Sequence, residues 1–198
     1  NGSVRNALVI GAEKMSSIVD WTDRQTCVLF GDGAGAVIWS RSEDGRGLLA
    51  TAMGCDGRLA DLLIVPAGGS RKPASAETVA AREHSIRMSG REVFRHAVVN
   101  MAQAARDAIA KAGCTLADIT WVIPHQANQR IIEAIAERLE LPIERFYLNL
   151  ERTGNMSGAS IPVALDEAVR AGKIRPGDRI LTVAFGSGLT WGASVIQL

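Results

Sequence analysis

The sequence has few cysteines and almost no net charge, and both scarcities exclude classes of protein. Its three cysteines, Cys27, Cys55 and Cys114, lie far apart and form no Cys-x-x-Cys pair, so neither a zinc site nor a disulfide framework is indicated. Free thiols are typical of a reducing compartment, and we therefore expect a cytoplasmic protein. The formal net charge is +1 and the basic residues are spread along the chain, which gives no sign of a nucleic-acid-binding surface.

The chain also lacks long apolar runs and several short motifs that mark common classes of protein. No segment approaches the ~20 apolar residues that a membrane span requires, so no membrane association is expected. Ser157 and Ser187 do not lie in a Gly-x-Ser-x-Gly nucleophile motif. The glycine-rich stretch 31–36 has neither the Gly-x-Gly-x-x-Gly spacing nor the following helix of a dinucleotide site. We expect its glycines to allow close packing between two strands.

The first half of the chain has the pattern of short strands separated by turns. Strands are expected over residues 6–10, 26–30, 37–39 and 48–53. A charged, glycine-bearing turn over residues 41–47 is the best boundary between two halves. Residues 66–84 have the proline, glycine and serine content of a long surface loop, and a short strand is expected over 85–88. Residues 1–3 are neither a start methionine nor a signal sequence, and we expect a further segment to precede them.

The longest predicted helix runs from Ser89 to about residue 112. Ser89 with Glu92 three residues later predicts a capping box, and Gly113 is expected to end the helix. Arginines recur at intervals of four residues, at Arg87, Arg91 and Arg95. The last two should share a helix face, which is typical either of a solvated surface or of a site for an acidic partner.

From residue 114 onward, predicted strands alternate with helices. The expected strands are 118–123, 146–150, 180–185 and 191–196, and the expected helices are 127–139 and 157–171. Apolar residues of the first of these helices recur at helical spacing. Pro162 falls in the first turn of the second, where proline is tolerated. The alternation predicts an α/β sheet covered by helices.

Three polar stretches in this second part form the candidate site. In residues 121–130 an apolar run ends just before His125, which places this histidine between the end of a strand and the start of a helix. Ligands bind at that position in open α/β sheets. The stretches 153–157, which contains Asn155, and 185–188 are expected to converge on it.

A histidine and an asparagine at one site suggest chemistry at an oxygen atom. The positive end of the following helix should disfavour a charged His125, and a neutral imidazole and the Asn155 amide are both hydrogen-bond donors. Two such donors aimed at one oxygen form an oxyanion hole suited to an enolate, and the turn 186–188 offers backbone N–H groups for a second oxyanion. For either residue taken alone, the simpler interpretation is a buried core histidine and a helix-capping asparagine.

Several motifs together resemble a known family. His-Gln-Ala-Asn at 125–128, Gly-Asn-Met-Ser at 154–157 and Phe-Gly-Ser-Gly-Leu-Thr-Trp-Gly at 185–192 look like signature stretches of β-ketoacyl-acyl carrier protein synthase III, a condensing enzyme of the thiolase superfamily. Residues 30–36 and 88–94 are similar to that family too. The resemblance covers essentially the whole chain, with the motifs in the right order.

The resemblance implies a fold and an activity. The fold would be α/β and thiolase-like, with α-β-α-β-α layers in duplicated halves. Residues 1–46 would be the last strands of the N-terminal half, and residues 47–198 would be the C-terminal half with the active-site histidine and asparagine. The implied activity is the decarboxylative Claisen condensation of an acyl-CoA primer with malonyl-acyl carrier protein, which initiates fatty acid synthesis. A homodimer is implied as well, and we expect no cofactor or metal, with the CoA thioester acting as substrate.

The resemblance also implies roles for individual residues. His125 and Asn155 would belong to a Cys-His-Asn triad and hold the thioester oxygen while the malonyl group loses carbon dioxide. Positions that line the family's pantetheine channel are matched by Met88, Gly90, Phe94, Ala127, Asn128 and Ile131. Phe185 matches the aromatic residue beside the active cysteine. Arg95 and Arg130 match basic positions of carrier-protein docking, which favours the acidic-partner interpretation.

Two departures from the family pattern leave alternatives open. Ser187 stands where the family has a glycine, which should leave its backbone N–H available. None of the three cysteines matches the nucleophile, so we expect that residues 1–198 alone cannot be acylated and that an upstream stretch supplies it. One alternative is a polyketide-type condensing enzyme, because 154–157 also resembles plant-type polyketide synthases, although 125–128 and 191–192 favour synthase III. The other is a non-catalytic subunit that binds acyl chains or carrier protein.

Overall fold

The computed structural model describes residues 3–198 as eight strands and five α-helices joined by turns. The strands are β1 (Asn6–Lys14), β2 (Asp32–Ser40), β3 (Gly47–Cys55), β4 (Leu63–Ile64), β5 (Arg87–Met88), β6 (Trp121–Pro124), β7 (Arg179–Gly186) and β8 (Thr190–Gln197). The helices are α1 (Ala76–Ala80), α2 (Gly90–Lys111), α3 (Gln129–Leu139), α4 (Leu150–Thr153) and α5 (Ser160–Arg170). None of these helices is both long enough and apolar enough to cross a membrane.

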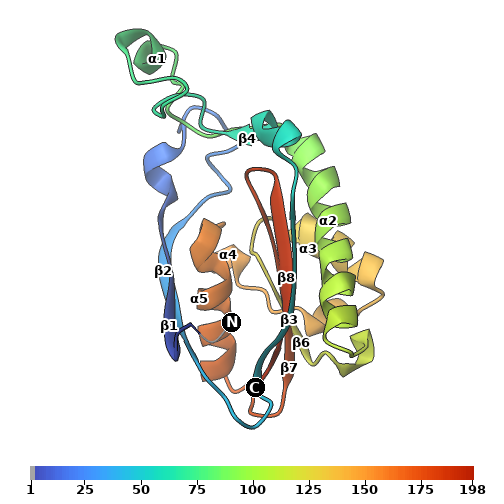
Figure 1. Cartoon of the computed structure of the whole chain (residues 1–198). Coiled ribbons are helices and arrows are strands. Elements are labelled where there is room, and N and C mark those ends of the chain that lie inside the picture. The colour runs from blue at the N-terminus through green and yellow to red at the C-terminus, as the bar shows by residue number, and fades with distance from the viewer. Residues whose placement is uncertain (1–2) are drawn as a thin grey trace.

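The elements stack in alternating layers of strand and helix (Figure 1). A four-stranded sheet has the order β3-β8-β7-β6, in which only the β6–β7 pair is parallel. Helices α2 and α3 cover one face of this sheet, and α5 lies on the other face, between the sheet and the separate β1–β2 hairpin (Figure 1). The predicted α/β sheet covered by helices is confirmed, and the 41–47 turn leads from β2 to β3 of the four-stranded sheet. A third sheet pairs β4 with β5.

The main core lies between the four-stranded sheet and the helices α2 and α3. Helix α2 turns a row of small residues inward, with Ala97, Ala105 and Ala108 almost completely buried, so it can approach the sheet closely. Helix α3 buries Ile132 and Ile135 completely. The helical spacing of apolar residues therefore predicted the buried faces correctly.

The glycine-rich stretch does serve close packing, but its close neighbours include a helix and not only a second strand. A Cβ on Gly33 would lie 2.3 Å from the Met156 sulfur, and one on Gly35 would lie 3.0 Å from Val163 in α5. On the paired strand, a Cβ on Gly11 would lie 2.4 Å from the carbonyl oxygen of Gly158. The β1–β2 hairpin therefore lies directly against the start of α5 because these positions lack side chains.

Two predicted strands are absent. Residues 26–29 form turns and Phe30 forms an isolated bridge to Asn155. The Asp23 carboxylate accepts hydrogen bonds from the Gln25 N–H (3.0 Å) and from the Thr26 hydroxyl (2.7 Å), and such local bonds compete with strand pairing. In the stretch 146–150 only Phe146 forms an isolated bridge, to Val122. The chain then enters α4 instead of continuing as a strand.

Some helix ends also differ from the prediction. Ser89 precedes α2 without a side-chain capping bond, so the predicted capping box is wrong. Glu92 instead bonds Arg95 at 2.6 Å. The 66–84 loop contains the short helix α1, and the strand expected over 85–88 shortens to β5. Gly113, with φ of 66°, follows the end of α2 as predicted.

Candidate active site

The candidate residues meet at one cavity of about 870 Å³, lined by residues from the four-stranded sheet, the β4–β5 pair, the segment between β1 and β2, helix α2, and the starts of α3 and α5. His125 and Asn155 both line it. So do all of the residues matched to substrate binding: Met88, Gly90, Phe94, Ala127, Asn128, Ile131 and Phe185. The side chains contributed by residues 3–198 include no Asp, Glu, Lys or Arg. The cavity is therefore mainly apolar, with a few convergent polar groups, as is usual for small-molecule sites.

His125 directly follows Pro124, the last residue of β6, and continues the hydrogen bonding between β6 and β7. Its N–H donates to the carbonyl oxygen of Val183 at 2.7 Å, and the residue is only 9% exposed. Burial lowers the pKa of His125 from 6.5 to about 4, since a buried imidazolium loses its hydration. The neutral form was predicted, and desolvation is a cause that the sequence did not reveal; helix α3, whose positive end was expected to act on His125, begins at Gln129.

Asn155 is held by backbone and side-chain bonds that leave its amide nitrogen available. Its N–H donates to Leu29 at 2.8 Å, and its carbonyl accepts from Gly31 at 3.0 Å. The side-chain oxygen accepts the Ser157 N–H at 2.9 Å, whereas Nδ2 has no hydrogen-bond partner among residues 3–198. Asn155 thus supports the following 3₁₀ turn (Ser157–Ala159) and still presents a donor at the cavity.

Two glycines allow this arrangement. A Cβ on Gly31 would lie 2.1 Å from the carbonyl oxygen of Thr153. That distance is too short for any side chain at this position. Gly154 has φ of 66°, and a Cβ there would lie 3.3 Å from the Leu29 carbonyl oxygen. Asn155 therefore reaches its position because glycine stands on both sides of the contact.

The turn after β7 presents a backbone donor at the same cavity. Gly186 and Ser187 line the cavity. The Ser187 hydroxyl donates a hydrogen bond to the Leu63 carbonyl oxygen at 2.7 Å. The backbone N–H of Ser187 has no acceptor within the described part of the chain, and neither has that of Gly188, which follows it but does not line the cavity. The serine therefore leaves its backbone N–H available, as predicted.

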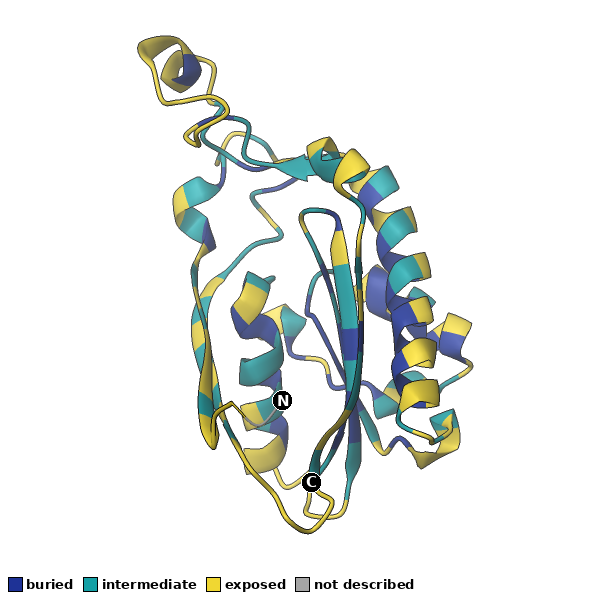
Figure 2. Cartoon of the chain, in the orientation of Figure 1, coloured by how far each residue is buried: buried dark blue, intermediate teal, exposed yellow. Residues whose placement is uncertain are grey.

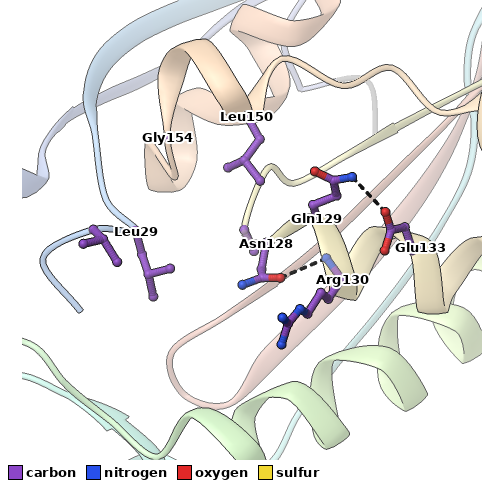
Figure 3. A pocket seen from close by; sticks show the side chains of 9 residues that line it. Leu29, Asn128, Gln129, Arg130, Glu133, Leu150 and Gly154 are labelled. Atoms are coloured by element: carbon purple, nitrogen blue, oxygen red, sulfur yellow. Dashed lines mark hydrogen bonds between the residues drawn. The ribbon is translucent and has the colours of Figure 1, made fainter. Parts of the chain in front are cut away.

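The two arginines matched to carrier-protein docking lie outside the main cavity. Arg130 lines a smaller pocket of about 400 Å³ at the start of α3, which shares Leu29, Ala127 and Asn128 with the main cavity (Figure 3). The Asn128 side chain caps α3 there, because its oxygen accepts the Arg130 N–H at 2.9 Å. Arg95 is exposed and bonds Glu92.

None of the three cysteines lines the cavity. Cys55 is exposed, and Cys27 and Cys114 are half-buried. Across residues 3–198 no group of three or more His, Cys, Asp or Glu side chains is arranged to hold a metal ion.

Gln126 is a site residue to which sequence reasoning assigned no role of its own. It is completely buried and hydrogen-bonds both the end of β6 and the segment that leads to α4. The only signal in the sequence was a polar residue near the end of an apolar run, and three of its four partners lie more than twenty positions away. Periodicity carries no information about such partners.

Comparison with known proteins gives consistent matches along the chain. The family model described as 3-oxoacyl-[acyl-carrier-protein (ACP)] synthase III C terminal matches residues 109–198. The model described as 3-oxoacyl-[acyl-carrier-protein (ACP)] synthase III matches residues 1–57. The β-ketoacyl-[acyl-carrier-protein] synthase III of Caldanaerobacter subterraneus subsp. tengcongensis is 55% identical over 196 residues, which is 99% of this chain and 59% of that protein. That of Clostridioides difficile is 54% identical and is covered to 60%.

Solved structures match over the whole chain. The 3-oxoacyl-[acyl-carrier-protein] synthase III of Aquifex aeolicus has a TM-score of 0.88 at 49% identity, with 100% of this chain and 59% of that chain covered. The priming β-ketosynthase of the R1128 polyketide pathway has a TM-score of 0.88 at 34% identity, with 100% and 58% covered. The predicted thiolase-like layered fold is confirmed. The chain spans about three fifths of the length of the curated relatives it matches.

Proposed function

This chain belongs to the 3-oxoacyl-[acyl-carrier-protein] synthase III family, and from that premise we propose that it forms the malonyl-binding part of a decarboxylating condensing enzyme. The enzyme would join an acyl-CoA primer to malonyl-acyl carrier protein and so initiate fatty acid synthesis. One observation carries the proposal: a neutral, buried His125 and the free amide donor of Asn155 lie at one cavity whose described lining has no charged side chain.

The first step would be loss of carbon dioxide from the malonyl thioester. The bond between the carboxylate and the central carbon breaks, its electron pair moves into an enolate, and the negative charge comes to the thioester oxygen. His125 and Asn155 would donate hydrogen bonds to that oxygen. Removing one donor from such a site costs about 10²–10³ in kcat. The uncharged lining favours the step, because no cation described at the cavity holds the malonyl carboxylate in its charged form.

The second step would form the carbon–carbon bond. The enolate carbon attacks the carbonyl carbon of an enzyme-bound acyl thioester, a tetrahedral oxyanion forms, and the thiolate leaves as the carbonyl is restored. The backbone N–H of Ser187, at the cavity, would be a donor for that oxyanion. The nucleophilic cysteine would come from outside residues 1–198, since Cys27, Cys55 and Cys114 do not line the cavity.

Further protein against the β1–β2 hairpin is part of the proposal. The outer face of this hairpin exposes Leu8 (62%), Ile10 (62%) and Ile38 (73%), and Figure 2 shows exposed residues along both strands. Natural proteins usually cover such apolar faces. We assign residues 1–46 to the end of an N-terminal half and 47–198 to the C-terminal half, within a cytoplasmic homodimer as the family resemblance suggests.

The substrates would reach the cavity through its channel residues. The pantetheine arm of the malonyl carrier would pass Met88, Gly90 and Phe94 on one side, and Ala127, Asn128 and Ile131 on the other. Phe185 would lie beside the acyl thioester. Arg95 and Arg130 lie outside the main cavity and would bind the acidic surface of the carrier protein, by charge attraction that steers association.

Intact-mass measurement and two variants test the proposal. The protein from its source is incubated with acetyl-CoA, denatured and weighed. The expected result is a polypeptide heavier than 21.0 kDa that carries an acetyl adduct. His125→Ala and Asn155→Ala should keep this adduct but lose about 10²–10³ in malonyl decarboxylation. Absence of any adduct, from this chain or a companion, would instead favour the non-catalytic binding subunit.

A polyketide-type condensing enzyme is the second candidate, favoured by the match to the R1128 priming β-ketosynthase. Both candidates use the same site and the same two steps, so site variants do not separate them. Identification of the product released with malonyl carrier protein and different acyl-CoA primers decides between them.

A further inference from the structure

Gln126 uses all of the hydrogen-bonding capacity of its side chain in a completely buried position. Its Nε2 donates to the carbonyl oxygens of Pro124 and Tyr147, both at 3.0 Å. Its Oε1 accepts the backbone N–H groups of Asn149 at 3.1 Å and of Leu150 at 3.2 Å. Two carbonyl partners and two N–H partners allow only one orientation of the amide.

Three of these bonds, to Tyr147, Asn149 and Leu150, join the two segments that carry the proposed catalytic pair, and the fourth, to Pro124, lies within the first segment. On one side, Pro124 and Gln126 directly flank His125 in the chain. On the other side, Asn149 and Leu150 stand at the start of α4, which is a single helical turn. Gly154 ends this turn, and Asn155 follows it in the chain. The first N–H groups of a helix have no partner within the helix, and Gln126 supplies an acceptor for them in α4.

Few other hydrogen bonds join these segments. One backbone bond joins Tyr147 to Val122 at 3.0 Å, before the chain reaches α4. The backbone of Asn155 is bonded to Leu29 at 2.8 Å, which anchors it to the N-terminal part of the chain and not to β6. Among the described residues, Gln126 provides the only side-chain hydrogen bonds between the β6 end, residues 121–128, and residues 146–156.

We propose that Gln126 is a positioning residue that sets the separation of the His125 and Asn155 donors, so that both reach the same oxygen. This inference rests on the proposed function. Loss of the Gln126 amide leaves two carbonyls and two N–H groups buried without partners, and the segments must part to hydrate them. A shift of about 1 Å in a catalytic group can cost about 10²-fold in rate.

Two variants of the full-length protein test the role. Gln126→Met fills nearly the same space and removes all four bonds, whereas Gln126→Glu keeps the acceptors for α4 and removes the amide donors. Arg145→Met is the matched control. The Arg145 guanidinium donates to the Ile119 carbonyl oxygen at 3.2 Å, so this side chain also joins the segment before β6 to the segment before α4. Neither Arg145 nor Ile119 lines the cavity. Each protein is measured for thermal unfolding, acyl loading from acetyl-CoA, and kcat and KM for malonyl-thioester decarboxylation.

The expected result is a selective loss. Both Gln126 variants should load acetyl at the wild-type rate while kcat for decarboxylation falls about 10–100-fold, with KM changed little, and Arg145→Met should retain both activities. A parallel loss of loading and decarboxylation, or an unchanged kcat in either folded variant, overturns the positioning role. If the wild-type protein itself fails to decarboxylate malonyl thioester, the proposed function fails and the inference falls with it.

Discussion

His125 should make the folded protein sensitive to mild acid. Burial holds its pKa at about 4, against 6.5 for the unperturbed side chain. Between these values the unfolded chain binds a proton that the folded chain does not, so the free energy of unfolding decreases as pH falls from 6.5 toward 4 and is unaffected above 6.5. At about 1.4 kcal/mol per pKa unit, the full loss is about 3 kcal/mol, and about 2 kcal/mol is already lost at about pH 5.

Urea unfolding at about pH 7.5 and about pH 5 measures this loss in the wild-type protein and in His125→Gln, whose side chain does not titrate. Carboxylates contribute equally to both proteins, so they cancel in the comparison. The wild type should lose about 2 kcal/mol more than the variant over this range. His96→Gln, which removes a half-buried imidazole from α2, is the control. Equal losses in wild type and His125→Gln would refute the argument that burial keeps this histidine neutral.

Two further substitutions test packing around the site. Gly31→Ala would place a Cβ 2.1 Å from the Thr153 carbonyl oxygen and should lower the free energy of urea unfolding by about 1–3 kcal/mol. Gly57→Ala is the control and should be nearly neutral, because a Cβ there would have no atom within 4 Å. Equal effects of the two substitutions would contradict the close contact at Gly31. Ile132→Ala in the completely buried face of α3 should cost about 2–5 kcal/mol in the same assay. Val99→Ala, at an exposed position of α2, should cost far less, and similar costs would argue against the predicted core.

The long helices could be predicted because one face of each is apolar at helical spacing. Helices α2 and α3 lie within two residues of their predicted limits, and Ile132 and Ile135 are buried as expected. Short apolar runs carry no such signal, because strand and turn both accommodate them. The stretches 26–30 and 146–150 were therefore misassigned: side-chain bonds from Asp23 set the first as turns, and Gln126 supports the start of α4 in the second.

The sequence by itself determined which chemical groups are present and their order along the chain. The motifs around His125, Asn155 and residues 185–192 identified the family and the residues that line the cavity. The lack of a cysteine in a matching motif was visible there as well. These features are local, so they can be read from neighbouring residues.

Only the tertiary structure decided how those groups behave. The pKa of His125 falls because distant segments bury it. Asn155 keeps a free amide donor because its backbone pairs with residues 29–31 and its side-chain oxygen accepts the Ser157 N–H. Gln126 acquires a role only when its partners at residues 147–150 are brought beside it. Burial and hydrogen-bond partners depend on which remote segments meet, and residue types alone do not specify that.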